Sequence, residues 1–408
     1  MQTNLASFIR NTPEGDTAEE ILRRCVHCGF CQATCPTYQE LGDELDSPRG
    51  RIYLIKEMLE GAEVTGSTQL HLDRCLTCRN CETTCPSGVE YGKLVDIGRA
   101  VVAEKVSRPL HDRLLRSALR YGLNSPLFGP AMALGRMMRP ILPQVLRSKV
   151  PPRQASRPLP ANTENHARQV IMLQGCVQPA MMPAIDEATI RVLDAVGIGT
   201  RVVPGAGCCG AINLHLDAQN QALDQMRANI DVWWPLLNRG EAECVVANAS
   251  GCGAMLREYA HHLRNDPVYA GKAQDLSNAV RDVAELLEPH AAELGQRIGA
   301  ISGRHAFHPP CTLQHWQRLR GTTEKVLGDL GFKLVPFDES HLCCGSAGTY
   351  SITQKELSTR LRDRKLGHIA KAAPDSIVSS NMGCITQLQS GASVPVRHWI
   401  EVVDEALN

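Results

Sequence analysis

The 408-residue sequence has no excess of charge and no long apolar run, and these absences exclude several classes of protein. It contains 43 basic and 43 acidic residues, so its overall charge does not favour a nucleic-acid-binding protein or an enzyme for acidic substrates. No window of eighteen residues is entirely apolar, which argues against a membrane-spanning helix. The first twenty residues lack a basic stretch followed by an apolar stretch, the pattern of a secretory signal. We therefore expect a cytoplasmic protein.

Cysteine, in contrast, is abundant, with 17 residues in the chain. In a reducing compartment, cysteines serve as metal ligands or redox groups more often than as structural disulfides. The spacing of these cysteines therefore carries most of the functional information.

Two runs near the amino terminus share one cysteine pattern. Residues 25–36 read CVHCGFCQATCP and residues 75–86 read CLTCRNCETTCP, so both follow C-x2-C-x2-C-x3-C-P. This pattern is typical of ferredoxins with two [4Fe-4S] clusters, in which the fourth cysteine of each run binds the cluster of the other run. The predicted ligand sets are Cys25, Cys28, Cys31 and Cys85 for one cluster, and Cys75, Cys78, Cys81 and Cys35 for the other. A pair of zinc sites is the alternative, but zinc sites usually pair two C-x2-C knuckles.

The segment between the two runs predicts a helix. Ser47 is a suitable N-cap, Pro48 suits the first helical position, and Gly61 follows the expected end. A helix at this place favours an α-helical ferredoxin domain over the small β-hairpin type. His27 lies inside the first run, where we expect it to tune the cluster by hydrogen bonding or to have no role.

Eight of the remaining nine cysteines form a tandem repeat. Each half holds one cysteine, 31 intervening residues and a Cys-Cys pair followed by glycine, with 42 or 39 residues between the second cysteine of the pair and a last cysteine. The two sets are Cys176, Cys208, Cys209 and Cys252, and Cys311, Cys343, Cys344 and Cys384. The flanking sequences repeat as well, so the carboxyl-terminal half is a tandem duplication. Cys244 lies outside the repeat, in a predicted strand, and is expected to be a buried apolar residue.

The cysteines of each set follow short apolar runs that predict buried strands. In the first half these runs are residues 170–175, 201–207 and 244–251, and helical patterns such as residues 216–240 separate them. Alternating strands and helices predict a parallel sheet with right-handed crossovers. Because ligands gather at the carboxyl ends of such strands, each half should bring its four thiolates together. The occupant stays open between an iron–sulfur cluster, zinc and free redox-active thiols.

Three further residues or motifs near these cysteines have weaker signals. Residues 205–210 match the G-x-G-x-x-G pattern of a dinucleotide site, but the repeat of this loop loses the first two glycines, which argues against phosphate binding. His308 and His341 lie close to cysteines of the second set, where hydrogen bonding at a metal site and turn capping are both open interpretations.

Residues 105–168 form a basic connector, with twelve Lys or Arg residues and only two acidic ones. One interpretation is a solvated linker. The other is a surface that meets anionic lipid or a partner subunit, since the connector also holds apolar residues.

The sequence thus predicts five parts. They are a tail at 1–20, an α-helical 2[4Fe-4S] ferredoxin-like domain at 21–104, the basic connector at 105–168, and a duplicated α/β parallel-sheet domain with modules at 169–300 and 301–408.

The twin motifs and the duplicated modules resemble the iron–sulfur subunits of bacterial glycolate oxidase (glycolate dehydrogenase) over nearly the whole chain. Close segments include CVHCGFCQATCPTYQELGDELDSPRGRIYLIKEMLEG, SHLCCGSAGTY and VRHWIEVVDEAL. More distant relatives with Cys-Cys-Gly (CCG) modules are heterodisulfide reductases, the membrane-anchor subunit of anaerobic glycerol-3-phosphate dehydrogenase and a lactate-utilisation iron–sulfur protein. In heterodisulfide reductases each module ends in C-x2-C and binds a noncubane cluster. Met255 and Gln387 stand at those positions here, which argues against that cluster and against disulfide reduction.

The resemblance implies an electron-transfer subunit of a flavin-dependent glycolate and D-lactate dehydrogenase. A partner flavoprotein would oxidise the 2-hydroxy acid, and this chain would pass electrons towards the respiratory chain and a quinone, from a peripheral position on the cytoplasmic face of the inner membrane. The sequence has no convincing flavin-binding motif, so no catalytic residue is assigned to this chain. The alternatives are a subunit of another 2-hydroxy-acid or glycerol-3-phosphate dehydrogenase, a thiol–disulfide reductase, and a scaffold that metals only stabilise.

Overall fold

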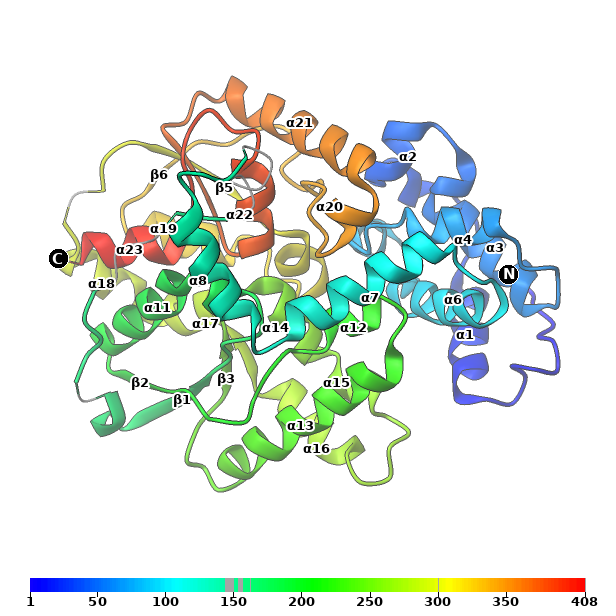
Figure 1. Cartoon of the computed structure of the whole chain (residues 1–408), viewed down its shortest axis with the longest axis horizontal. Helices are drawn as coiled ribbons and strands as arrows, with labels where there is room; N and C mark the ends of the chain where they lie inside the picture. The colour runs from blue at the N-terminus through cyan, green and yellow to red at the C-terminus, as the bar shows by residue number, and fades with distance from the viewer. Residues whose placement is uncertain (144–149, 153–156, 162, 300, 408) are drawn as a thin grey trace.

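The computed structural model describes residues 1–143, 150–152, 157–161, 163–299 and 301–407. A helical unit built from the amino-terminal hundred residues lies at one end of the molecule, and two α/β units fill the rest (Figure 1).

Short helices surround the two ferredoxin-type cysteine runs. They are α1 (Pro13–Arg24), α2 (Pro36–Leu41), α3 (Pro48–Leu59), α4 (Gly66–Asp73), α5 (Asn80–Thr84) and α6 (Tyr91–Lys105). The predicted helix α3 is confirmed, with the Ser47 hydroxyl accepting a hydrogen bond from the Gly50 N–H at 3.0 Å and Pro48 as its first residue. Gly61 then leaves the helix with a positive φ of 103°, a conformation that favours glycine. The amino-terminal unit is therefore helical between the motifs.

The segment 1–20 is not the tail that the sequence suggested. Leu5 and Ile9 are buried in the same core as the helices that carry the cysteine runs, and Thr12 caps α1 by accepting from the Gly15 N–H at 3.0 Å. Leu5, Phe8 and Ile9 form an apolar pattern too short to predict an element, so only tertiary packing reveals the role of this segment.

Each carboxyl-terminal module is built on a four-stranded parallel sheet, which confirms the predicted fold class. The first sheet has the order β2-β1-β3-β4, with β1 (Arg168–Met172), β2 (Ile198–Arg201), β3 (Val245–Ala247) and β4 (Val280–Asp282). The second has the order β6-β5-β7-β8, with β5 (Arg304–His308), β6 (Lys333–Leu334), β7 (Ser376–Ser379) and β8 (Val396–His398). The matching strand orders support the tandem duplication.

Helices of similar placement accompany the two sheets. The first module has α10 (Gln178–Met181), α11 (Pro183–Ala195), α12 (Ala211–His215), α13 (Gln219–Asn238), α14 (Ser250–Arg257), α15 (Tyr259–His262), α16 (Ala270–Asn278), α17 (Val283–Leu287) and α18 (Ala291–Arg297). The second has α19 (Thr322–Asp329), α20 (Tyr350–Thr353), α21 (Lys355–Lys371), α22 (Met382–Gln389) and α23 (Trp399–Ala406).

Two strand details differ from the expectation. The strand expected within 201–207 ends at Arg201 in the structure, because Pro204 has no N–H to donate and Gly205 adopts a positive φ of 96°. The last strand of each sheet, β4 or β8, had not been expected. Each ends in the capping residue of the next helix, Asp282 or His398.

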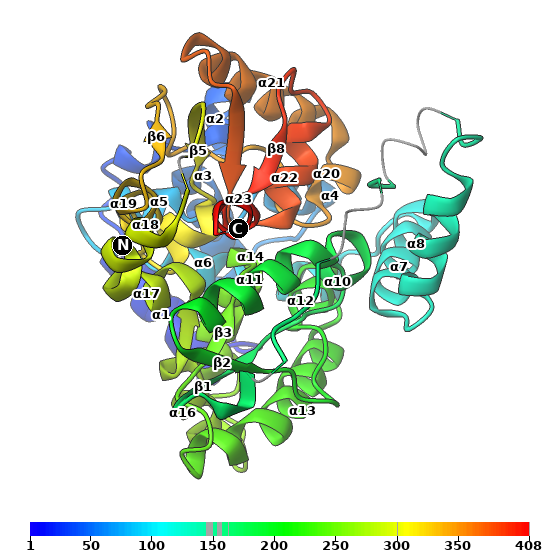
Figure 2. The same cartoon turned by 90° about the vertical axis from the view of Figure 1, so that its left-hand side faces the viewer.

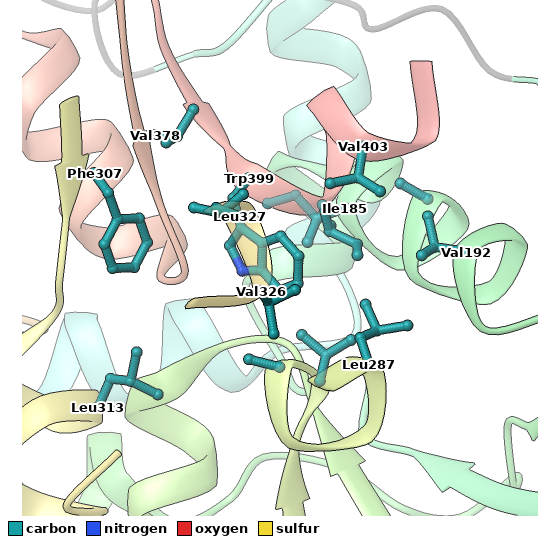
Figure 3. Packing of buried hydrophobic residues seen from close by; sticks show 14 of the residues in the cluster. Ile185, Val192, Leu287, Phe307, Leu313, Val326, Leu327, Val378, Trp399 and Val403 are labelled. Carbon is teal, nitrogen blue, oxygen red and sulfur yellow. The ribbon is translucent and has the colours of Figure 1, made fainter. Parts of the chain in front are cut away.

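The two modules share one hydrophobic core. Helix α11 packs against α23, so that Ile185 and Val192 meet Val403, while Trp399 is fully buried at the centre (Figure 3). An ion pair between Arg191 and Asp404, at 2.9 Å, crosses the same boundary. The modules therefore form one continuous body.

Part of the connector is folded rather than an open linker. Helices α7 (Leu110–Asn124) and α8 (Phe128–Met138) form an arm at the side of the molecule (Figure 2), here called the α7–α8 arm. Arg108 and Arg116 at its base pair with Asp73 and Asp217, which joins the arm to both the helical unit and the first module. Within the described ranges, no helix combines the length and apolar character needed to cross a bilayer.

The helical unit docks on the modules through the second cysteine run. Arg79 makes a two-pronged ion pair with Glu258 and stacks over the Trp316 ring at 3.5 Å. Trp316 in turn donates its indole N–H to the Thr77 carbonyl at 2.7 Å. Arg79 is 7 % exposed, so this contact is largely shielded from water.

We expect Arg79→Met to lower the free energy of unfolding by about 3 kcal/mol, because Glu258 keeps a buried charge without its partner. The double variant Arg79→Met with Glu258→Gln should recover part of this loss. Urea unfolding followed by circular dichroism measures both. Arg23→Met is the control, since its pair with Glu19 is exposed and should contribute less than about 1 kcal/mol. Equal losses of unfolding free energy for Arg79→Met and Arg23→Met would contradict a stabilising contact of Arg79 with Glu258 and Trp316.

Candidate functional site

One side of the helical unit holds a small cavity lined by the first predicted ligand set. Its walls include Cys25, Cys28, Cys31 and Cys85, with Pro48, Ile52 and Tyr91 from the packed helices. Cys28 is exposed and the other three are buried or half-buried, so this cavity lies at the surface of the unit. The crossing of Cys85 to the trio of the other run is the arrangement that the ferredoxin pattern requires.

A second small cavity holds the other set. Cys35, Cys75, Cys78 and Cys81 line it, and Cys81 also borders the first cavity. The two cavities are therefore neighbours separated by shared residues, such as Pro48 and Tyr91. Four thiols around each cavity fit a [4Fe-4S] cluster, and the assignment of single cysteines to each cluster stays a prediction.

Burial raises the pKa of several of these thiols and so favours their neutral form when no metal holds them. It raises the pKa of Cys31 to about 11, with the neighbouring Cys25 and Cys35 thiols adding to the effect, and raises the pKa values of Cys78 and Cys81 as well. Iron must therefore displace these protons, and cluster binding should contribute to folding of the unit.

A buried cation stands beside the second cavity. Arg51 is 1 % exposed and lines the cavity, where its guanidinium pairs with Asp46 at 3.2 Å and donates to Thr37 Oγ1 at 3.1 Å. Thr37 Oγ1 lies 3.2 Å from Cys35 Sγ, and the Tyr91 hydroxyl donates to Cys75 Sγ at 3.6 Å. A positive charge and hydrogen bonds near the sulfurs stabilise the reduced cluster. The sequence offered no signal for Arg51, because an arginine on a helix is usually solvated.

The second cavity faces the second CCG module. Cys78 packs in a small apolar cluster with Cys311 and Cys343, together with Leu76 and Tyr350. The Tyr350 hydroxyl also donates to the Arg74 carbonyl at 3.0 Å. The ferredoxin-type site and the second repeated cysteine set are therefore in direct contact.

The two repeated cysteine sets converge on one chamber of about 220 Å³ between the modules. Of the eight cysteines, all but Cys344 line it. The sequence predicted a separate site in each half, and the placement of both sets around a shared chamber follows from the module interface, which no local pattern encodes. Leu76, Thr77 and Trp316 close the side towards the ferredoxin-type unit.

Each set forms a chain of sulfur contacts. In the first module the Cys176 thiol donates to Cys208 Sγ at 3.4 Å, which lowers the pKa of Cys208, and Cys209 links Cys208 to Cys252. The second module repeats the chain, starting from Cys311 and Cys343 at 3.9 Å. Such sets suit soft metal ions.

The remaining candidates occupy other places. Met255 is buried, and Gln387 donates to the Ser358 hydroxyl at 2.8 Å, so neither position offers a thiolate. His341 contributes its carbonyl oxygen, which accepts from His315 at 3.0 Å. Cys244 is buried in the hydrophobic core, as predicted.

Comparison with protein families agrees with this division. Residues 21–89 match a family described as a 4Fe-4S dicluster domain, which places two [4Fe-4S] clusters in the helical unit. Residues 170–257 and 305–389 each match a family described as a cysteine-rich domain, called CCG.

Whole proteins with known names are also similar. The chain is 52 % identical to the glycolate oxidase iron–sulfur subunit of Escherichia coli (strain K12), over all of this chain and 99 % of that protein. It is 30 % identical to the probable glycolate oxidase iron–sulfur subunit of Bacillus subtilis (strain 168), over 91 % of this chain and 89 % of that protein. Lactate utilization protein A of Geobacillus kaustophilus is 26 % identical over 58 % of this chain and 98 % of its own length.

We expect Arg51→Met to make the reduction potential of the second ferredoxin-type site more negative by on the order of 50 mV, because a buried positive charge no longer stabilises the reduced cluster. Arg74 still pairs with Asp46 in this variant, at 2.8 Å, which limits the loss of stability. A redox titration followed by electron paramagnetic resonance (EPR) measures the shift. The control Arg49→Met removes a more exposed charge and should change either potential less. An unchanged potential in Arg51→Met would contradict the role of this residue.

Proposed function

We propose that this chain, which belongs to the family of glycolate oxidase iron–sulfur subunits, carries electrons out of a flavin-bearing partner that oxidises glycolate and D-lactate. The pair of neighbouring four-cysteine cavities, within a domain that matches the 4Fe-4S dicluster family, is the observation that carries this proposal.

Electron stoichiometry supports the division of work between two subunits. Oxidation of a 2-hydroxy acid to a 2-oxo acid releases two electrons and two protons, whereas a [4Fe-4S] cluster supplies one-electron chemistry. A flavin can accept the pair and release single electrons. The substrate step therefore belongs to the partner, and this chain contributes the burial, charge and hydrogen bonds that set the potential of each site.

The contacts suggest an order for the sites. Cys28 is exposed, so the first cavity is the accessible entry or exit, whereas the second cavity holds buried cysteines and adjoins the second CCG module through Cys78. Cys78 lies against Cys311 and Cys343. If the cysteines of the chamber hold a redox metal, electrons would therefore pass from the second cavity to the chamber. The acceptor beyond this chain is proposed to be a quinone of the respiratory chain.

The α7–α8 arm is proposed as the docking surface for the flavoprotein. Leu110, Leu114 and Tyr121 lie at helical spacing on α7 and are more than half exposed, and Leu134 and Met137 are exposed on α8. The concentration of exposed apolar side chains on these two helices favours an interaction site over a solvated linker.

The charge of the arm favours a protein partner over anionic lipid. Arg108 and Arg116 pair internally with aspartates, and Arg136 donates to the Ala180 and Met181 carbonyls. Part of the basic excess of the connector is thus paired with acidic side chains or carbonyl oxygens within the described structure. Arg147, Lys149 and Arg153 lie outside the described residues. Attachment to the inner membrane would then depend on the partner.

A thiol–disulfide reductase is the weaker candidate. Heterodisulfide reduction in related modules uses a further cysteine at the positions of Met255 and Gln387. Neither methionine nor glutamine can supply a thiolate, so these two positions cannot support that chemistry. Met255 is buried, and Gln387 donates a hydrogen bond to the Ser358 hydroxyl.

The complex purified without oxygen should contain at least about eight iron atoms and eight sulfides per copy of this chain. Glycolate should bleach the cluster absorbance, and Cys28→Ser should slow quinone-coupled glycolate oxidation at least tenfold, while the flavoprotein still reduces an artificial dye. Cys244→Ala, a cysteine of the core, is the matched control and should keep the coupled rate. Stoichiometric zinc without iron, or an unchanged coupled rate in Cys28→Ser, would contradict the proposal.

Leu114→Glu and Leu134→Glu should weaken binding to the flavoprotein about tenfold or more, because each places a charge in an apolar interface. Val268→Glu, at a similarly exposed apolar residue of the first module, should leave binding unchanged. Titration calorimetry measures the affinity, and sedimentation with anionic vesicles gives the comparison. Intact complexes combined with weaker vesicle binding would assign the arm to lipid instead.

A further inference from the structure

His308 is a buried histidine that lacks any hydrogen-bond partner among the described residues. It ends strand β5, is 1 % exposed, and leaves both Nδ1 and Nε2 without a partner. His305 on the same strand shows the usual arrangement, with Nδ1 at 2.8 Å from Ser376 Oγ and Nε2 donating to the Ser302 carbonyl at 3.1 Å. A buried polar group without a partner costs about 1–3 kcal/mol, so the site of His308 calls for a ligand.

Two cysteines supply the rest of a metal site. One ligand atom from each of His308, Cys344 and Cys384 lies within 4.8 Å of the others, and all three residues are buried. They come from the end of β5, the loop after β6 and the first turn of α22, so that one ion would tie three elements together. The Asn381 amide donates to Cys384 Sγ at 3.5 Å, and the Ser379 hydroxyl donates to the His308 carbonyl at 2.9 Å.

The duplicated module lacks this arrangement. His308 precedes Cys311 by three residues, and the residue three before Cys176 is Leu173, which is buried in the apolar core of the first module. The imidazole is therefore an addition to the repeated cysteine pattern, specific to the second module. A four-thiolate site common to both modules would not need it.

We propose that His308, Cys344 and Cys384 bind a single zinc ion. Zinc favours imidazole and thiolate ligands in a tetrahedron, and three protein ligands would leave a fourth position for water or for the neighbouring Cys343 thiol. Two thiolates also balance the charge of a divalent ion, which suits a buried site.

The position of the three ligands favours one ion over a cluster. Cys344 and His308 do not line the chamber, whereas Cys384 does, so a cluster inside the chamber would not reach two of the three ligands. The zinc site would thus lie at the edge of the chamber, with Cys384 lining the chamber and with Cys311 and Cys343 left beside Cys78. The four-thiolate set expected for the second module would then be divided.

Metal analysis and zinc X-ray absorption of the full chain test this inference. We expect about one zinc per chain in addition to the ferredoxin-type iron, with an imidazole nitrogen at about 2.0–2.1 Å and two or three sulfurs at about 2.3 Å. A spectrum with sulfur ligands alone would overturn the proposal. So would iron in place of zinc at this site, or a chain that holds no zinc even after Zn²⁺ is added.

Variants give an independent measurement. His308→Leu, which copies the first module, should retain at least tenfold less zinc in competition with a chelator, and His308→Cys should retain most of it. His305→Leu is the matched control on the same strand and should keep its zinc. Unchanged iron and sulfide in all variants separates this outcome from a failure of the ferredoxin-type sites. Full zinc retention with an unchanged spectrum in His308→Leu would overturn the proposal.

Discussion

The packing of the second cysteine run against the CCG modules brings the ferredoxin-type sites and the repeated cysteine sets together. Arg79, held between Glu258 and the face of Trp316, fixes the run at a point where its neighbour Cys78 meets Cys311 and Cys343. The hydrogen bond from the Tyr350 hydroxyl to the Arg74 carbonyl joins the same two parts. Together these contacts hold the sulfurs of the second ferredoxin-type site against those of the second CCG module.

The same logic explains the distribution of charge. A cluster bound by four thiolates carries negative charge into a region of low dielectric, where the buried guanidinium of Arg51 compensates part of it. Asp46 pairs with both Arg51 and Arg74. The exposed first cavity has no such fully buried cation among its lining residues. The two sites are therefore built for different surroundings, one open to a partner and one enclosed by the modules.

Much of this could be predicted from the sequence, because ligand spacing and strand periodicity are local. The paired motifs, helix α3, the parallel sheets and the duplication all follow from short windows. Contacts over long sequence separations could not be predicted in this way. Arg108 pairs with Asp217 across 109 residues, and Leu5 and Ile9 join a core that their own polar neighbours conceal. The metal site proposed at His308 likewise combines residues from three separate parts of the chain.

Two iron–sulfur sites that lie side by side in this chain should interact magnetically and exchange electrons. Pulsed EPR of the fully reduced protein detects that interaction. Neighbouring cavities that share Cys81 and Tyr91 in their walls should give two cluster signals of equal intensity with a strong magnetic interaction. A single signal, or two signals without interaction, would contradict it.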